Sequence, residues 1–193
     1  MPRWIPNIIT LLRIVLIPVF VVVALPTAAG AAPSMLARRL GALAALLAIG
    51  GSDLLDGYLA RKHNLVSKVG IVLDAVADKL AQISLGAYFT FVDQRLPLWF
   101  FGLLVLRDVL LGLGTYRLHA LGPETSFEHR YHGKVASTLI FGLLVLLTLG
   151  SHRSVIGPAT LLCAAAVVFS TVDYVRSGHA AYQAAKDAVR ADT

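Results

Sequence analysis

The sequence predicts an all-α integral membrane protein with six transmembrane helices. Hydrophobic residues occupy 57% of the 193 positions and charged residues only 15%, whereas soluble domains carry about 25% charged residues. Mean hydropathy is +0.74. Long runs of Leu, Val, Ala and Ile recur along the chain, without the short alternating segments that are typical of a transmembrane β-barrel. A helical span needs about 20 apolar residues, so the chain has room for six.

Breaks in the apolar runs set the expected boundaries of the spans. Pro26 and Pro33 interrupt the chain after the first span, and Pro97 follows the third. The stretch 119–133 is the longest polar loop, and 177–193 is a polar tail with helical character. Residues 1–6 are expected to form either a short interfacial helix or a frayed terminus. We expect one domain, 1–193, with spans at 8–25, 38–61, 71–92, 98–118, 134–150 and 156–176.

The placement of basic residues predicts that both termini face the cytoplasm. Arg13 divides the first apolar run, which favours a retained span over a cleaved signal peptide. With the N-terminus inside, the cytoplasmic flanks hold ten of the 17 Lys and Arg residues and the other side holds four. This asymmetry follows the positive-inside rule. It also indicates that the net charge of +6 serves contact with a membrane surface rather than binding of nucleic acid.

Two pairs of aspartates stand in or beside these apolar runs. An Asp at the centre of a membrane helix costs roughly 2.5–3.5 kcal/mol on insertion scales, so the positions require an explanation. Asp53 and Asp56 are three residues apart on one face of the second span, and Asp74 and Asp78 are four apart on one face of the third. The connection between the two spans is short, so the helices are expected to be antiparallel neighbours whose aspartates converge.

Four converging carboxylates predict a divalent metal site. Without a countercharge they would repel one another, and a cation relieves that repulsion. Ligation by oxygen alone suits Mg²⁺, Mn²⁺ or Ca²⁺ better than zinc.

Small residues share the faces of these aspartates. Gly57 and Ala60 lie on the face of Asp53, and Gly70 precedes Asp74 by one helical turn. Small side chains leave room for a bulky ligand to approach the backbone, although close helix packing also favours them. Arg61 follows directly and suits a phosphate or diphosphate, while its position also fits a positive-inside anchor.

These positions together form a pattern that resembles the complete signature of the CDP-alcohol phosphotransferase family. Eight fixed residues fall within 26 positions, in the order Asp53-x₂-Asp56-Gly57-x₂-Ala60-Arg61-x₈-Gly70-x₃-Asp74-x₃-Asp78. The stretch PNIITLLRIVLIP (6–18) is also similar to the bacterial phosphatidyltransferases of this family, with Asn7, Thr10 and Arg13 at the usual places. The resemblance extends from about residue 5 to residue 150.

The resemblance implies a homodimer in the bacterial inner membrane, with six spans and a polar cavity open to the cytoplasm. It implies that the four aspartates hold metal, usually two Mg²⁺ or Mn²⁺ ions, and that Asp78 is the general base. Gly57, Ala60 and Arg61, with Gly70, would line the site for CDP and substrate. The implied reaction is attack by an acceptor hydroxyl on the lipid-linked phosphorus of CDP-diacylglycerol, with release of CMP.

The acceptor is predicted to be sn-glycerol 3-phosphate. The length, the N-terminal stretch and Gly133-Lys134 resemble the phosphatidylglycerophosphate synthases. Arg107 and Lys134 are candidate ligands of an anionic acceptor, although Arg107 could instead pair with Asp108 or Asp173. Ala75 stands where those synthases usually have proline. Arg107-Asp108 is more similar to the cardiolipin synthases of the family, which makes phosphatidylglycerol the first alternative acceptor. Inositol phosphate and serine are further alternatives.

Two other classes of protein remain open on the residues alone. Intramembrane prenyltransferases use aspartate-rich metal sites on membrane diphosphates, but in longer chains with two separate motifs. A cation transporter could bind its substrate through buried aspartates, but it would not need Gly57, Ala60, Arg61 and Gly70 at fixed offsets. Release of CMP from CDP-diacylglycerol would distinguish a phosphatidyltransferase from a prenyltransferase and from a transporter.

Overall fold

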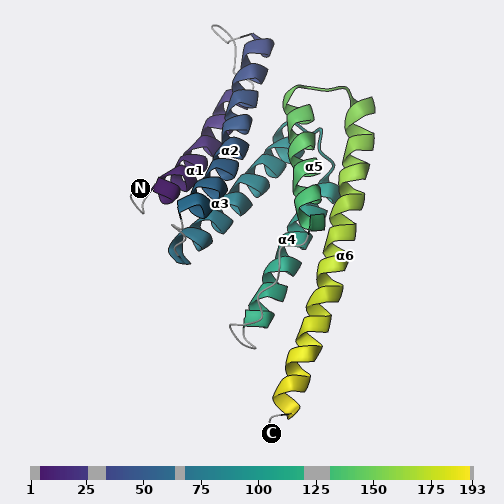
Figure 1. The fold of residues 1–193 in the computed structure, drawn as a ribbon. Helices are drawn as coiled ribbons and strands as arrows, with labels where there is room; N and C mark the ends of the chain where they lie inside the picture. The colour runs from purple at the N-terminus through teal and green to yellow at the C-terminus, as the bar shows by residue number, and fades with distance from the viewer. Residues whose placement is uncertain (1–4, 26–33, 64–67, 120–130, 192–193) are drawn as a thin grey trace. The chain divides into compact units, whose positions relative to one another are not determined.

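A computed structural model of the chain describes residues 5–25, 34–63, 68–119 and 131–191, and these are almost entirely helical (Figure 1). Side chains are described for most of them, but not for residues 53–63 and 68–73. The described part of the chain contains six α-helices and one short π-helical segment, in the order α1 (Ile5–Ala24), α2 (Met35–His63), α3 (Lys68–Ala87), η1 (Tyr88–Val92), α4 (Leu98–His119), α5 (Tyr131–Thr148) and α6 (Arg153–Ala191).

Each expected span coincides with a helix, and two helices of the described part are long and apolar enough to cross a bilayer. These two segments are Met35–Ser52 of α2 and Arg153–His179 of α6; Thr10–Ala24 and Gly133–Thr148 form shorter apolar helices. The polar tail is helical, as expected, because α6 continues without a break to Ala191. At 1.5 Å per residue its 39 residues measure roughly 58 Å. The expected interfacial helix falls mainly on residues 1–4, outside the described residues.

The chain divides into two compact units. Unit 1 contains residues 1–96 and 144–153, and unit 2 contains residues 97–143 and 154–193. The candidate aspartates belong to unit 1, and the candidate acceptor ligands Arg107 and Lys134 belong to unit 2. The single-domain organisation stays a prediction.

The core of unit 1 is formed by α1, α2 and α3, with α1 packed against both other helices (Figure 1). Each helix contributes a buried stripe with helical spacing. The stripe of α1 contains Ile17 and Phe20, and that of α2 contains Leu46 and Ile49. The stripe of α3 is built from smaller residues, Ala77, Ala81 and Leu85.

Tyr88 joins the end of α1 to the end of α3. Its ring meets Phe20 and Phe89 edge-on, at centroid distances of 5.7 and 5.2 Å, the arrangement that aromatic quadrupoles favour. Its hydroxyl donates a hydrogen bond of 2.8 Å to the carbonyl of Ala24, one of the last carbonyls of α1 that has no partner within its own helix. The last five residues of the expected third span, 71–92, are π-helical.

Close approach of α1 and α2 depends on Gly41. A Cβ atom at this position would lie 2.9 Å from Cγ1 of Val23, closer than ordinary van der Waals contact. The missing side chain therefore sets how near the two helices lie. This matters for function because α1 also contacts α3, and the same three helices carry the candidate site.

Two arginines of unit 1 bind backbone carbonyls at the end of α5, close to the start of α2. Gly150 closes α5 with a φ of 75°, a left-handed conformation that favours glycine. The carbonyl of Leu147, in the last turn of α5, accepts a hydrogen bond of 2.6 Å from Arg95, and that of Leu149, just after the helix, accepts one of 3.3 Å from Arg39. These contacts fix the connections on the side opposite to the aspartates.

In unit 2, contacts of α6 with α4 and α5 hold the helices together. The hydroxyl of Tyr174 donates to the carbonyl of Leu111 at 3.3 Å. A Cβ atom on Gly114 would lie 3.0 Å from the ring of the same tyrosine. The thiol of Cys163, which is buried, donates to the carbonyl of Leu139 at 3.3 Å.

Candidate functional site

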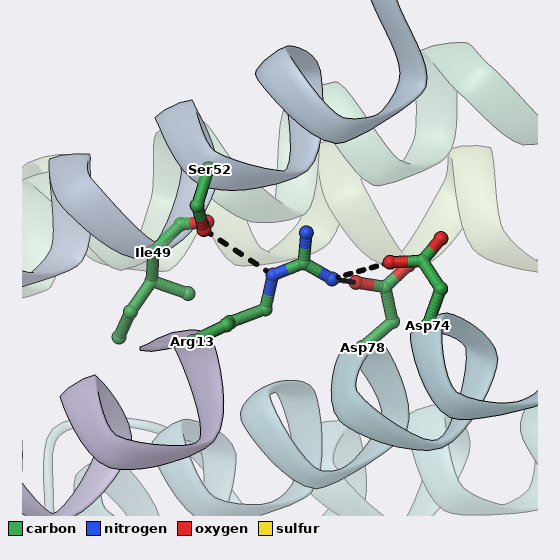
Figure 2. A network of polar contacts seen from close by, with 5 residues as sticks. All are labelled: Arg13, Ile49, Ser52, Asp74 and Asp78. Atoms are coloured by element: carbon green, nitrogen blue, oxygen red, sulfur yellow. Dashed lines mark hydrogen bonds and ion pairs between the residues drawn. The ribbon is translucent and has the colours of Figure 1, made fainter. Parts of the chain in front are cut away.

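Arg13 of α1 bridges two of the four candidate aspartates (Figure 2). Its Nη1 atom lies 2.9 Å from Oδ1 of Asp74 and 2.5 Å from Oδ1 of Asp78, both on α3. A single guanidinium nitrogen therefore contacts both carboxylates. The spacing of four residues between the aspartates places them on one face of α3, as the sequence predicted, and the same face is turned toward α1.

The second half of α2 also contacts this guanidinium. Nε of Arg13 lies 3.4 Å from Oγ of Ser52, a long hydrogen bond, and the Ser52 hydroxyl donates to the carbonyl of Ile49 at 2.7 Å (Figure 2). Ser52 directly precedes Asp53 in the chain. The guanidinium thus lies where the first half of α1, the second half of α2 and the first half of α3 meet.

The local sequence explains why these polar groups gather at one end of unit 1. The buried stripe of α1 runs Phe20, Ile17, Arg13 and Thr10 toward the N-terminus, so it changes from apolar to polar along one face. The stripes of α2 and α3 change in the same way, toward Ser52 and toward Asp78. Apolar packing of the three helices therefore forces their polar ends together.

Burial differs sharply across the ion pairs. The side chain of Arg13 is 1% exposed, whereas those of Asp74 and Asp78 are 41% and 48% exposed. The cation is therefore anchored inside the helix contact, while the carboxylates face the accessible side of the site. Carboxylate oxygens that are open to solvent are the ligands that a hard divalent cation requires. These donors fit Mg²⁺ or Mn²⁺.

The structure describes the backbone of the other signature residues but not their side chains. These residues are Asp53, Asp56, Gly57, Ala60 and Arg61 in the last turns of α2, and Gly70 in the first turn of α3. Among the side chains that are described, no group of three or more acidic, His or Cys residues forms a metal cluster. Asp53 and Asp56 are not in that set, so the convergence of all four aspartates stays a prediction.

Of the candidate acceptor ligands, Arg107 is buried and Lys134 is exposed. The side chain of Arg107 is 8% exposed, with Nη1 4.0 Å from Oδ1 of Asp108. Its Nε atom is buried and has no hydrogen-bond partner within the described part of the chain. The pairing with Asp108, the alternative to acceptor binding, is thus present at a distance that only just qualifies as an ion pair. Lys134 stands in the first turn of α5.

Arg13 is the residue whose role at the site the sequence analysis did not identify. It was expected as an interruption of the first span and as part of an N-terminal stretch, not as a partner of Asp74 and Asp78. A signal was present: Thr10 and Arg13 are three residues apart and continue the helical spacing of Ile17 and Phe20. A cation on the buried face of an apolar helix requires an anionic partner, and the aspartates of the second and third spans were candidates for it.

Comparison with known proteins gives a family match over most of the chain. The profile of the CDP-alcohol phosphatidyltransferase family matches residues 3–172. A CDP-diacylglycerol–glycerol-3-phosphate 3-phosphatidyltransferase of Rickettsia felis is 45% identical over 75 residues, covering 39% of this chain and 38% of the relative.

Two further relatives carry cardiolipin synthase names. A Drosophila melanogaster protein named "Probable cardiolipin synthase (CMP-forming)" is 39% identical over 117 residues, covering 58% of this chain and 36% of the relative. A Mycobacterium bovis protein provisionally named a cardiolipin synthase is 33% identical over 141 residues, covering 73% of this chain and 61% of the relative. The chain therefore matches less than two thirds of the length of each of these relatives.

The family profile spans most of the chain, from the start of α1 into α6, and includes both helices of the aspartate motif. The chain belongs to the CDP-alcohol phosphatidyltransferase family.

Proposed function

We propose that this protein transfers the phosphatidyl group of CDP-diacylglycerol to an acceptor hydroxyl and releases CMP, as a step of phospholipid biosynthesis. The observation that carries the proposal is the complete aspartate signature, with Asp74 and Asp78 side by side on α3 and bridged by one cation. Family membership supports the same reaction. The names of the Rickettsia and Drosophila relatives point to the same chemistry.

The nucleotide part of the donor would bind at the small residues of the signature. Gly57, Ala60 and Gly70 would let the CDP group approach the backbones of α2 and α3. Arg61 would contact the diphosphate through its planar guanidinium, which matches phosphate oxygens in pairs. The two acyl chains would remain in the bilayer.

Asp53, Asp56, Asp74 and Asp78 would hold the metal, two Mg²⁺ or Mn²⁺ ions by resemblance to the family. When bound, the metal supplies charge neutralisation of the diphosphate and of the departing CMP. The support within this structure is the donor set: two accessible carboxylates one helical turn apart on α3.

Asp78 would act as the general base. Its carboxylate would accept the proton of the acceptor hydroxyl while the acceptor oxygen forms a bond to the lipid-linked phosphorus. The bond between this phosphorus and the oxygen of CMP breaks, and CMP leaves with the bonding electron pair. The 48% exposure of the Asp78 side chain supports access of an acceptor to this carboxylate.

The acceptor is proposed to be sn-glycerol 3-phosphate, which would give phosphatidylglycerophosphate. Support comes from the Rickettsia relative, which is named for glycerol 3-phosphate. Two cations of unit 2, Arg107 and Lys134, would bind the acceptor phosphate. The buried Nε of Arg107, which has no protein partner among the described residues, supports a ligand at this guanidinium.

Phosphatidylglycerol is the second candidate acceptor and would give cardiolipin. Arg107 is followed by Asp108, as in the cardiolipin synthases that the motif resembles. The relatives with that name also match over more of this chain than the Rickettsia enzyme does.

We further propose that all six α-helices span the bacterial inner membrane, in a homodimer with both termini in the cytoplasm. The distribution of Lys and Arg supports this orientation. In it, the ends of α2 and α3 that carry the aspartates face the cytoplasm, where CDP-diacylglycerol and water-soluble acceptors meet.

An acceptor panel tests the function. Purified protein in detergent or liposomes receives CDP-diacylglycerol, Mn²⁺ and one acceptor at a time: glycerol 3-phosphate, phosphatidylglycerol, inositol phosphate or serine. CMP release and the mass of the lipid product are measured. CMP release that depends on glycerol 3-phosphate, with phosphatidylglycerophosphate as product, is expected. Turnover with another acceptor alone would keep the reaction and overturn the acceptor, and no CMP release with any acceptor would overturn the reaction.

A further inference from the structure

Arg13 occupies the position of a cation between two carboxylates that are proposed metal ligands. Its single Nη1 atom lies within 2.9 Å of both Oδ1 atoms. Metal–oxygen distances are about 2.0–2.1 Å for Mg²⁺ and about 2.3–2.6 Å for Ca²⁺. A protonated nitrogen at 2.5 and 2.9 Å therefore contacts, at somewhat longer distances, two oxygens of the carboxylates that are proposed to hold the metal.

This cation is part of the protein and cannot leave the site as a solvent ion would. Arg13 comes from α1, is 1% exposed and has its Nε atom near Ser52 of α2. The pairs that it forms connect residues 61 and 65 positions apart in the chain. Its charge is therefore fixed by the packing of three helices, in contact with carboxylates that are nearly half exposed.

From this geometry we infer that Arg13 is the internal counter-cation of the aspartate site. It holds Asp74 and Asp78 together when metal is absent, and its charge and its hydrogen bonds compete with metal for the same oxygens. The inference rests on the proposed metal site, and it makes Arg13 a positioning residue that sets how tightly the site binds metal.

The direction of the effect follows from charge. A positive group in contact with two carboxylates reduces the repulsion between them and also reduces their attraction for a divalent ion. Removal of this charge should therefore make the metal-free protein less stable and the metal-bound site tighter. Loss of packing alone would lower stability equally with and without metal.

The experiment compares the wild-type protein with Arg13→Gln and Arg13→Lys. Thermal unfolding is measured in EDTA and in saturating Mn²⁺, and the Mn²⁺ affinity is measured by electron paramagnetic resonance of the free ion. Neither readout requires turnover. Glutamine keeps a hydrogen-bond donor without charge, and lysine keeps the charge without the planar guanidinium.

The matched control is Arg95→Gln. Arg95 also pairs with an aspartate, Asp93, and bonds a carbonyl of the same unit, but it lies at the opposite end of the helices from Ser52. The same chemical change at this position should lower Tm by an equal amount in EDTA and in Mn²⁺. Its Mn²⁺ affinity should equal that of the wild-type protein.

For Arg13→Gln we expect a Tm several degrees lower in EDTA, and a smaller deficit in Mn²⁺. We expect its Mn²⁺ dissociation constant to fall roughly tenfold, within the usual range of coupling between two linked binding events. Arg13→Lys should lie between the wild-type protein and Arg13→Gln in both measurements.

Two results would overturn the inference while the metal site stands. One is an equal loss of Tm in EDTA and in Mn²⁺ with unchanged affinity, which assigns Arg13 to packing alone. The other is weaker Mn²⁺ binding in Arg13→Gln, which means that Arg13 assists metal binding rather than competing with it. If the wild-type protein did not bind Mn²⁺, the metal site of the proposed function would be overturned. The inferred competition between Arg13 and metal would be overturned as well.

Discussion

Nη1 of Arg13 lies 2.5 Å from Oδ1 of Asp78, although 65 positions separate the two residues in the chain. The pair joins the first helix to the third and places a positive charge against the proposed general base. Both residues occupy helix faces that continue an apolar stripe. The contact is therefore a consequence of how the core of unit 1 packs, and it brings the N-terminal stretch and the aspartate motif into one site.

The first prediction concerns metal. A chelator should abolish CMP release, and Mg²⁺ or Mn²⁺ should restore it, because uncompensated charge on the diphosphate opposes transfer. Asp53→Asn and Asp74→Asn should each weaken Mn²⁺ binding while the protein still inserts into membranes. Asp93→Asn, in the pair with Arg95, is the control and should keep wild-type Mn²⁺ affinity. Near-normal turnover in either site variant would show that the four-carboxylate site is misassigned.

The second prediction separates chemistry from binding. Asp78→Asn keeps an oxygen ligand but removes the base, so kcat should fall by about 10²-fold or more, the scale of general-base loss. Binding of CDP-diacylglycerol, measured by equilibrium titration, should survive. A loss of donor binding in proportion to the loss of turnover would indicate that Asp78 acts chiefly as a metal ligand.

The third prediction identifies the acceptor ligands. Arg107→Ala and Lys134→Ala should raise the KM for glycerol 3-phosphate far more than the KM for CDP-diacylglycerol, because each removes a cation from the acceptor phosphate. Arg153→Ala removes an exposed cation at the start of α6 and serves as the control, with both KM values unchanged. Equal increases in the two KM values for Arg107→Ala would show that Arg107 stabilises the fold rather than binding the acceptor.

The fourth prediction tests the helix contact that supports the site. Gly41→Ala should lower Tm, because the new Cβ would lie 2.9 Å from Val23 and a β-branched side chain on a helix has little freedom to move away. Gly102→Ala in α4 is the control. Gly102 is exposed, and a Cβ there would meet no described heavy atom within 4 Å. Helix propensity alone favours alanine over glycine by roughly 1 kcal/mol.

Thermal unfolding of the two glycine variants in the same detergent gives the comparison. The control should unfold at the wild-type temperature or above it. If Gly41→Ala behaved like Gly102→Ala, the close approach of α1 and α2 would not limit stability.

Sequence alone determined the helical class, the positions of the helices and the pairing of aspartates within each helix. Periodicity and composition are local properties, and the spacing of Asp74 and Asp78 fixes their common face once the segment is helical. The family signature is also local, because its eight residues fall within 26 positions. The expected spans at 98–118 and 8–25 accordingly differ from α4 and α1 by only a few residues.

Tertiary structure decided which countercharge the aspartates meet. The sequence presented Arg13 as an exception within an apolar run, and nothing within a few residues of it carries a negative charge. Its partners became visible only when α1 packed against α3, because contacts between distant segments depend on which stripes face one another. The partner of Tyr88 was likewise decided by tertiary packing, because its hydroxyl donates to the carbonyl of Ala24 at the end of α1. Local patterns specify each helix, whereas the burial of three apolar stripes against one another specifies how their polar ends combine.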